Sequence, residues 1–462
     1  MWGVRGVTAR AWLGILLAVL AGALCTAGWL RCEGEKPELD GPERVFVGRG
    51  PVTVAVEARD ADSGIRHLDL RVVQGALKKR IAEIARPGNL GVGGARGAVE
   101  QIEAVIDAEQ LGLREGDAKL VAKAADWSWR RWLSGNPQAL EIPLTVDLTR
   151  PRINVETGQT YVQRGGAGAV VYGVGEKTQR DGVQVGDAFF PGHPFPGDPK
   201  RRIALFAIPR DVASNPRIAV VAVDLAGNEA SASWPVALAE RVFDDVRIEL
   251  GNSFLQVKVR DLAEAVGVKE EDPLSAFRKI NSEIRAQNEK KIRELIARST
   301  DEPLFEAEFR QMRNSAVTSG FAERRSYYVD DVKVSEAIHF GYDLASTAGA
   351  PIEAANRGRV LFAGELGIYG NCVLLDHGLG LVSLYAHLSQ ISVAEGDLVE
   401  KNQQLGRSGA TGLAGGDHLH YAMLVGDAYV DPTEWWDAKW VEEKVMSRLG
   451  GREEIAVEKA KP

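Results

Sequence analysis

The chain has 462 residues, of which 45% are hydrophobic and 26% are charged. This composition is close to the globular average and excludes a collagen-like rod, a coiled coil and a fully disordered chain. Because 56 Lys and Arg stand against 64 Asp and Glu, the net charge is −8, and we expect no nucleic-acid partner.

The first informative segment is an uncharged apolar run from Ala11 to Leu30. A helix of this length spans roughly 30 Å, the thickness of the hydrocarbon core of a bilayer. Arg5 and Arg10 precede the run, which favours a cytoplasmic N-terminus. Residues 1–32 are therefore predicted to be a signal-anchor that crosses the cytoplasmic membrane once, with the bulk of the chain in the periplasm or another extracytoplasmic space. The alternative is a cleaved secretory signal, with residues 21–23 as its small-x-small site.

Two stretches of strand-like alternation follow a polar linker. Val52, Val54 and Val56 lead into the turn at 60–64, and the run Ile-Ala-Val-Val-Ala-Val-Asp at 218–224 leads into Leu-Ala-Gly-Asn-Glu. Period-2 alternation closed by turn residues is typical of half-buried strands. We therefore expect two β-sandwich modules, at 40–149 and 150–240. These modules weakly resemble bacterial immunoglobulin-like modules, which implies a fold and no chemistry.

Residues 241–330 are predicted to be a helical connector. Asp272-Pro273 is a typical helix start, and an apolar stripe follows it along one helix face, although Asn288 interrupts that stripe. We expect the stripe to pack onto a neighbouring domain. The alternative is a regulatory or partner-binding helix, which includes an enzyme held latent until a partner displaces the connector.

From 333 to 437 the sequence alternates short apolar runs with glycine turns, which predicts a compact all-β domain. Residues 441–462 are charged and free of aromatic residues, and we expect a disordered tail there. The chain as a whole is therefore predicted to be mainly β.

Five of the seven histidines lie between residues 339 and 420. His339 and Asp343 are four residues apart and share one side of an extended segment, while His418 and His420 share one face of a strand. His387 stands at the end of another strand. Two His and one Asp are enough ligands for a catalytic zinc, which takes three protein ligands and leaves a fourth position for water. Two imidazoles remain for proton transfer and for stabilising charge, so the inventory indicates metal-assisted hydrolysis.

The same region resembles the lysostaphin/LytM-type zinc endopeptidases of peptidoglycan. The resemblance rests on His-Phe-Gly-Tyr-Asp at 339–343, Tyr-Ala-His-Leu-Ser at 385–389 and His-Leu-His at 418–420, in the family's order and spacing. It implies a zinc metallopeptidase domain at 333–437. The site residues that it implies are the Zn²⁺ ligands His339, Asp343 and His420, and the non-ligand catalytic pair His387 and His418.

Three further positions bear on this resemblance. His377 matches a family position without metal and is expected to be structural. Asn402 stands where the family often has Gly, and Ala422 stands near a position where the family often has Glu. Because all five polar site positions are retained, the resemblance implies an active enzyme.

The expected function is therefore a membrane-tethered, zinc-dependent endopeptidase that hydrolyses peptide cross-links of bacterial peptidoglycan. Its expected partners are peptidoglycan, the cytoplasmic membrane through the N-terminal helix, and cell-wall or division proteins through the sandwich modules. The alternative is a non-enzymatic scaffold that binds the cell wall or activates another wall hydrolase.

Overall fold

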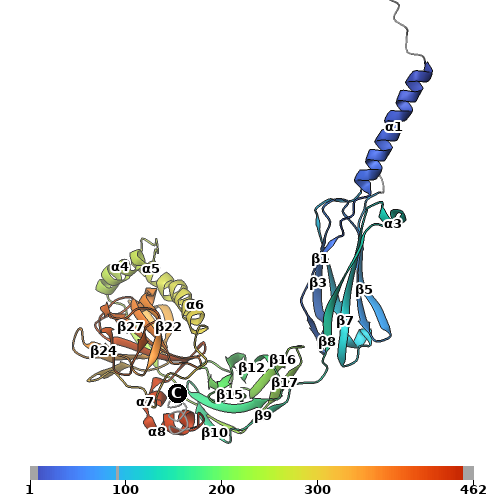
Figure 1. Ribbon diagram of the computed structural model, residues 1–462. Helices are drawn as coiled ribbons and strands as arrows, with labels where there is room; N and C mark the ends of the chain where they lie inside the picture. Colours follow the sequence, from blue (N-terminus) through green and yellow to red (C-terminus); the bar gives the residue numbers. More distant parts are fainter. Residues whose placement is uncertain (1–8, 90–92, 451–462) are drawn as a thin grey trace, which may run out of the picture. The chain divides into compact units, whose positions relative to one another are not determined.

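The structure, a computed structural model, describes residues 9–89 and 93–450 (Figure 1). It is mainly β, and its contacts divide the chain into two compact units. Of the described residues, the first unit comprises those up to residue 150 together with 223–228, and the second comprises residues 151–222 together with those from 229 onwards.

The N-terminal helix of the first unit, α1 (Ala9–Arg31), covers the segment that was expected to span a membrane. Many of its large apolar side chains are exposed, among them Trp12, Leu13 and Leu17. Within the described residues, however, no helix combines the length and the apolar character that a membrane crossing requires. The expected transmembrane helix is therefore not supported.

Two sheets that share one hydrophobic core make up the rest of the first unit. Their strand orders are β1-β3-β6 and β2-β8-β7-β4-β5. Alternate residues such as Val54 and Val56 of β3, and Leu68 and Leu70 of β4, are buried in one cluster, as in a β-sandwich. The likeness to immunoglobulin modules stays a prediction. The elements are β1 (Glu38–Asp40), β2 (Val45–Val47), β3 (Val52–Arg59), β4 (Ile65–Gln74), β5 (Leu77–Ala85), β6 (Val99–Ile106), α2 (Ala108–Leu111), β7 (Gly116–Asp126), α3 (Arg130–Leu133) and β8 (Pro137–Val146).

The strands between residues 151 and 240 have no core of their own. They form the sheets β14-β15-β11-β9 and β13-β12-β16-β17 and the parallel pair β10-β18. Val170 of β11 and Leu205 of β15 belong to the same buried cluster as Val425 and Trp435 near the C-terminus. This segment was expected to be a separate module, and it shares its core with the C-terminal domain instead. The strands are β9 (Ile153–Val155), β10 (Thr160–Gln163), β11 (Ala167–Val174), β12 (Thr178–Val185), β13 (Ala188–Pro191), β14 (His193–Phe195), β15 (Asp198–Ala207), β16 (Ile218–Asp224), β17 (Glu229–Ala232) and β18 (Val236–Ala239).

The connector is helical where Asp272-Pro273 predicts a helix start. The Asp272 carboxylate accepts a hydrogen bond from the backbone N–H of Ser275, and Pro273 occupies the first turn. The apolar stripe, which includes Phe277 and Ile280, shares a buried cluster with Leu361 and other residues of the C-terminal domain, as expected. In Figure 1 the helices α4, α5 and α6 lie beside that domain. The helical segments are η1 (Phe254–Val259), α4 (Arg260–Ala265), α5 (Pro273–Lys279), η2 (Ile280–Ile284) and α6 (Arg285–Ile296).

The C-terminal domain is built on an eight-stranded sheet. Its order is β20-β23-β31-β27-β26-β25-β29, with β32 paired to β31. Two smaller sheets, β19-β21-β22 and β24-β30-β28, accompany it. The elements are β19 (Asp245–Glu249), β20 (Ala316–Ser319), β21 (Glu323–Val329), β22 (Val332–His339), β23 (Tyr342–Ala345), β24 (Pro351–Glu353), β25 (Gly358–Glu365), η3 (Gly367–Tyr369), β26 (Asn371–Asp376), β27 (Leu381–Leu388), β28 (Gln390–Ile391), β29 (Leu398–Val399), β30 (Gln404–Arg407), β31 (Leu419–Val425) and β32 (Ala428–Val430).

The segment after Trp440 differs from the disordered tail that was expected from residue 441. After α7 (Pro432–Trp436) and α8 (Ala438–Val441), the chain continues as the helical segment η4 (Glu442–Met446). Val445 and Leu449 are buried in the same cluster as the C-terminal domain. Val441, Val445 and Leu449 recur at helical spacing and are buried, so one face of this segment is apolar although the segment carries many charges. The remainder of the expected tail, 451–462, lies outside the described residues.

Candidate active site

Three neighbouring strands and the end of a fourth position the predicted site residues. Asp343 on β23 pairs directly with His420 on β31, and Ala386 on β27 pairs with the same His420. His339 is the last residue of β22, and His387 follows Ala386. Strand register therefore brings together residues that are up to 81 positions apart.

The three predicted metal ligands converge on one point. Nε2 of His339 lies 2.9 Å from Oδ1 of Asp343 and 2.9 Å from Nδ1 of His420. Nδ1 of His420 lies 3.0 Å from the same carboxylate oxygen. Nδ1 of His339 must donate its proton to the Gly320 carbonyl, 2.8 Å away, so its Nε2 carries a lone pair. Three atoms with lone pairs in one place fit a divalent cation.

The surroundings of His420 also fit a metal ligand. Burial lowers the pKa of this imidazole to about 4, so the ring is neutral, which is the form that ligates metal. Gly341 is required beside it, because a Cβ at that position would lie 2.7 Å from the ring. The glycine in the His-Phe-Gly-Tyr-Asp motif therefore lets the backbone approach His420.

Asp343 stays ionised although it is buried. Burial opposes its negative charge, but its contacts with His339, His418 and His420 hold the pKa of the carboxyl well below its usual range. Arg325 donates to the other oxygen, Oδ2, at 2.8 Å. Oδ1 is thus left facing the two imidazole nitrogens.

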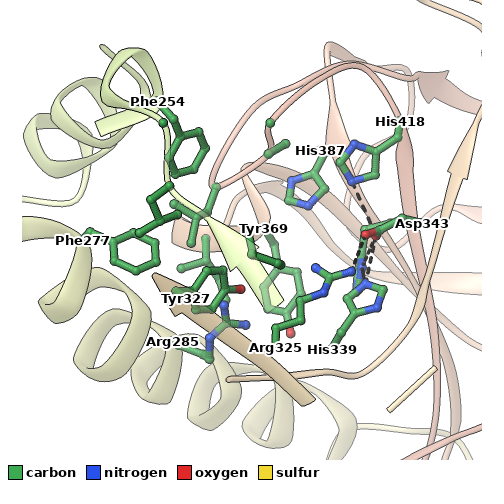
Figure 2. Close-up of a pocket in the computed structure, with 18 of the residues that line it drawn as sticks. Phe254, Phe277, Arg285, Arg325, Tyr327, His339, Asp343, Tyr369, His387 and His418 are labelled. Carbon is green, nitrogen blue, oxygen red and sulfur yellow. Dashed lines mark hydrogen bonds and ion pairs between the residues drawn. The ribbon is translucent and has the colours of Figure 1, made fainter. Parts of the chain in front are cut away.

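His387 and His418 form a second pair next to the first group (Figure 2), with ring centroids 4.9 Å apart. Nδ1 of His387 donates to the Thr411 carbonyl, and Nδ1 of His418 donates to the Gly416 carbonyl, each at 2.8 Å. In the neutral rings both Nε2 atoms are therefore proton acceptors.

The two rings of this pair differ in basicity. Burial and the neighbouring histidines move the pKa of His387 well below its ordinary value. Burial would also lower the pKa of His418, but its hydrogen bond to Asp343 and the charge of that carboxylate raise it overall. Neighbouring groups whose pKa values are pushed apart in this way are suited to acid–base work.

Gly320 and the start of β21, which the sequence analysis did not single out, support both His339 and Asp343. Besides Arg325, the start of β21 contains Glu323, whose carboxylate accepts from Ser319 Oγ at 2.9 Å and lies 3.4 Å from Arg325 Nε. Glu323 and Arg325 are two residues apart on β21 and therefore share a face. This two-residue spacing is the sequence feature that could have indicated their shared role, and it is a weak indication.

His377 lies apart from this group, as expected for a structural histidine. It is fully buried, and its ring nitrogens contact the Arg357 carbonyl and Ser383 Oγ, both at 2.7 Å. Burial lowers its pKa to about 4. Tyr385 also packs, with its hydroxyl 2.8 Å from the backbone nitrogen of Ala355.

A pocket of about 350 Å³ opens onto the histidines and Asp343. Phe254, Phe277 and Arg285 of the connector form its far wall (Figure 2). Leu250 also lines the pocket. This pocket is therefore built by two segments that the sequence patterns assign to different domains.

Comparison with known proteins matches this domain to peptidases. Residues 337–432 match Peptidase family M23. The DD-carboxypeptidase/endopeptidase Mpg of Neisseria meningitidis serogroup B is 41% identical over 95 residues, which cover 21% of this chain and 22% of the relative. The peptidoglycan DD-endopeptidase ShyB of Vibrio cholerae is 35% identical over 115 residues, which cover 25% and 26%.

The chain thus spans about a quarter of the length of these curated relatives. Among solved structures, the catalytic domain of the antimicrobial peptidase lysostaphin from Staphylococcus simulans is 28% identical. The similarity covers 28% of this chain and 98% of that one, with a TM-score of 0.24.

Proposed function

Because the C-terminal domain of this chain is a peptidase M23 (LytM-type) domain, we propose that the protein is a zinc-dependent endopeptidase that hydrolyses peptide cross-links of peptidoglycan. The observation that carries the proposal is the convergence of His339, Asp343 and His420 beside a second pair of imidazoles.

His339 Nε2, Asp343 Oδ1 and His420 Nδ1 are the atoms that would hold the zinc. Zinc in such a site supplies Lewis acidity to a bound carbonyl and lowers the pKa of bound water. A scaffold that only binds the cell wall would not need the His387 and His418 pair, so the retained pair favours an enzyme.

His387 and His418 handle the proton in this proposal. Because each Nδ1 donates to a backbone carbonyl, each Nε2 can accept a proton from the attacking water. The protonated ring can then donate a hydrogen bond to the oxygen on which negative charge develops. The two rings lie side by side, with centroids 4.9 Å apart, so either Nε2 lies beside the group that would receive its proton.

The substrate class follows from the names of the relatives, which include peptidoglycan DD-endopeptidases. An enzyme with this substrate works outside the cytoplasmic membrane, where the cell wall lies. We therefore extend the proposal to an extracytoplasmic location.

The test uses the full chain on purified sacculi. Activity should disappear with a chelator, return with one equivalent of zinc, and be absent from Asp343→Ala. The exposed Asp427, in the same domain, offers the matched control Asp427→Ala, which should remain active. Persistent hydrolysis after zinc removal would contradict the zinc mechanism, and intact sacculi under all conditions would favour the scaffold.

A further inference from the structure

The helical part of the connector, residues 254–296, places one positive charge in the pocket. Arg285 begins α6 and lines the pocket together with the site histidines (Figure 2). Its Nη2 donates to Oδ1 of Asn281 at 2.8 Å, and its Nε lies 3.3 Å from the Asn281 carbonyl. Asn281 is itself buried and donates to Ser335 Oγ at 2.8 Å. The guanidinium is therefore held in place before any ligand arrives.

The carboxylates around Arg285 are committed to other groups. Glu249, which also lines the pocket, pairs with Arg247. Glu289, one helical turn along α6, accepts hydrogen bonds from the hydroxyls of two tyrosines, Tyr369 and Tyr429. Asp343 pairs with the second arginine of the pocket, Arg325. In the part of the chain that the structure describes, both side-chain hydrogen bonds of Arg285 go to neutral oxygens of Asn281.

The walls near Arg285 are apolar and aromatic. They are formed by Phe254 and Phe277 of the connector, together with Ile368, Leu413 and the ring of Tyr327. In such a setting the effective dielectric is lower than in water, so a guanidinium attracts an anion more strongly. A charge-assisted pair with a carboxylate also matches the planar donor geometry of Arg.

We propose that Arg285 binds a free carboxylate of the peptide substrate, in a subsite beside the metal ligands. This inference rests on the proposed function and adds its specificity: the preferred substrates are cross-linked peptides that carry a free carboxylate beside the bond that is cut. The connector is then part of the substrate site. Its removal abolishes the preference for acidic peptides and does not release a latent enzyme.

The test measures binding, with no turnover required. Calorimetry on the metal-free full chain compares a purified cross-linked muropeptide dimer with the same dimer after its carboxylates have been converted to amides. The wild type should bind the free acid at least about tenfold more tightly than the amide, which is the difference in affinity expected from one charge-assisted hydrogen bond. Arg285→Gln should bind both forms with equal, weak affinity, and Arg285→Lys should retain part of the preference.

Arg293 supplies the matched control, because it lies on the same helix with an exposed side chain. Arg293→Gln should keep the wild-type preference. Equal affinity of the wild type for acid and amide would overturn the subsite without using any variant. A full preference in a folded Arg285→Gln, judged by an unchanged thermal transition, would overturn it as well.

The same variants separate this inference from the proposed function. In steady-state hydrolysis of the free acid, Arg285→Gln should raise KM about tenfold with little change in kcat, because binding is lost and the proton-transfer groups remain. If the protein binds acidic peptides through Arg285 but cleaves nothing, the proposed function fails and the subsite stands. If Arg285→Gln cleaves both forms with the wild-type ratio, the subsite fails and the function stands.

Discussion

At the residue scale, the guanidinium of Arg325 decides which oxygen of Asp343 faces the two imidazoles. It occupies Oδ2 and leaves Oδ1 2.9 Å from Nε2 of His339. Gly320 acts in the same way on His339 by accepting the proton of Nδ1. Such outer partners fix the orientation of a ligand and contribute to its affinity for metal.

We therefore predict that Arg325→Gln weakens zinc binding by about 10- to 100-fold, the usual cost of losing an outer partner. Competition against a chromophoric chelator measures this change. Arg324 is the adjacent control, because its side chain is exposed and lies 3.6 Å from Asp245. Equal zinc affinities for Arg325→Gln, Arg324→Gln and the wild type would show that Arg325 does not position Asp343.

His387 should affect turnover without affecting metal content. Its Nδ1 contacts the Thr411 carbonyl and its ring is not part of the converging ligand group. His387→Ala should bind one zinc and lose about 10²- to 10⁴-fold in kcat, the usual contribution of a general acid or base. His420→Ala, by contrast, should lose both zinc and activity. Loss of zinc in His387→Ala would move this histidine into the ligand set.

The sequence could indicate that these five side chains come together, because motif spacing and strand periodicity bring them to shared faces. Their roles as ligands and as a catalytic pair come from the family resemblance and stay a prediction. The outer partners could not be predicted from the sequence. Glu323 pairs with His339, and Arg325 pairs with Ala337, only through the register of β21 with β22. Register depends on the packing of the whole sheet, which a local pattern does not encode.

At the scale of elements, the side chain of Glu434 on α7 ties the C-terminal segment to the strands before residue 240. Its carboxylate accepts from the backbone N–H of Ala167 at 2.8 Å and from Gln163 Nε2 at 3.1 Å. Burial raises its pKa from 4.5 to about 7. The folded state therefore favours the neutral acid more strongly than the unfolded chain does.

This shift predicts a loss of stability with rising pH. The contribution is fully present below pH 4.5 and is lost as the pH rises through about 7, with an upper size of about 3 kcal/mol. Urea unfolding at pH 5 and pH 8 should show this loss in the wild type and in the exposed control Glu442→Gln. Glu434→Gln should lack it, because its amide does not titrate. The same pH dependence in Glu434→Gln would assign the loss to other groups.

The long connector helix shows what a local pattern can and cannot predict. Its start at Asp272-Pro273 follows from capping chemistry, and its apolar face follows from periodicity. Asn288, which interrupts that face, is buried and accepts a hydrogen bond from the backbone N–H of Ile368 at 2.9 Å. Periodicity alone identifies such a residue only as a polar interruption of an apolar face. The donor that pairs with its side-chain oxygen lies on another element, which a local pattern does not show.

At the scale of the whole molecule, apolar patterns located the buried strands but did not reveal which segments share a core. The strands between residues 151 and 240 and the helices that begin at Pro432 were assigned to separate parts of the chain, yet they belong to one buried cluster. Alternation of apolar and polar residues indicates that one face of a strand is buried, but it does not indicate which segment covers that face. For the same reason, apolar patterns did not predict that the connector lines the pocket beside the histidines.

The central claim is that one group of five side chains makes this chain a zinc endopeptidase of the cell wall. Mass analysis of the products released by the zinc-loaded full chain from a defined cross-linked muropeptide dimer tests it most directly. We expect two monomers whose summed mass exceeds that of the dimer by one water, and none from Asp343→Ala. An unchanged dimer, or equal cleavage by Asp343→Ala, would contradict the claim.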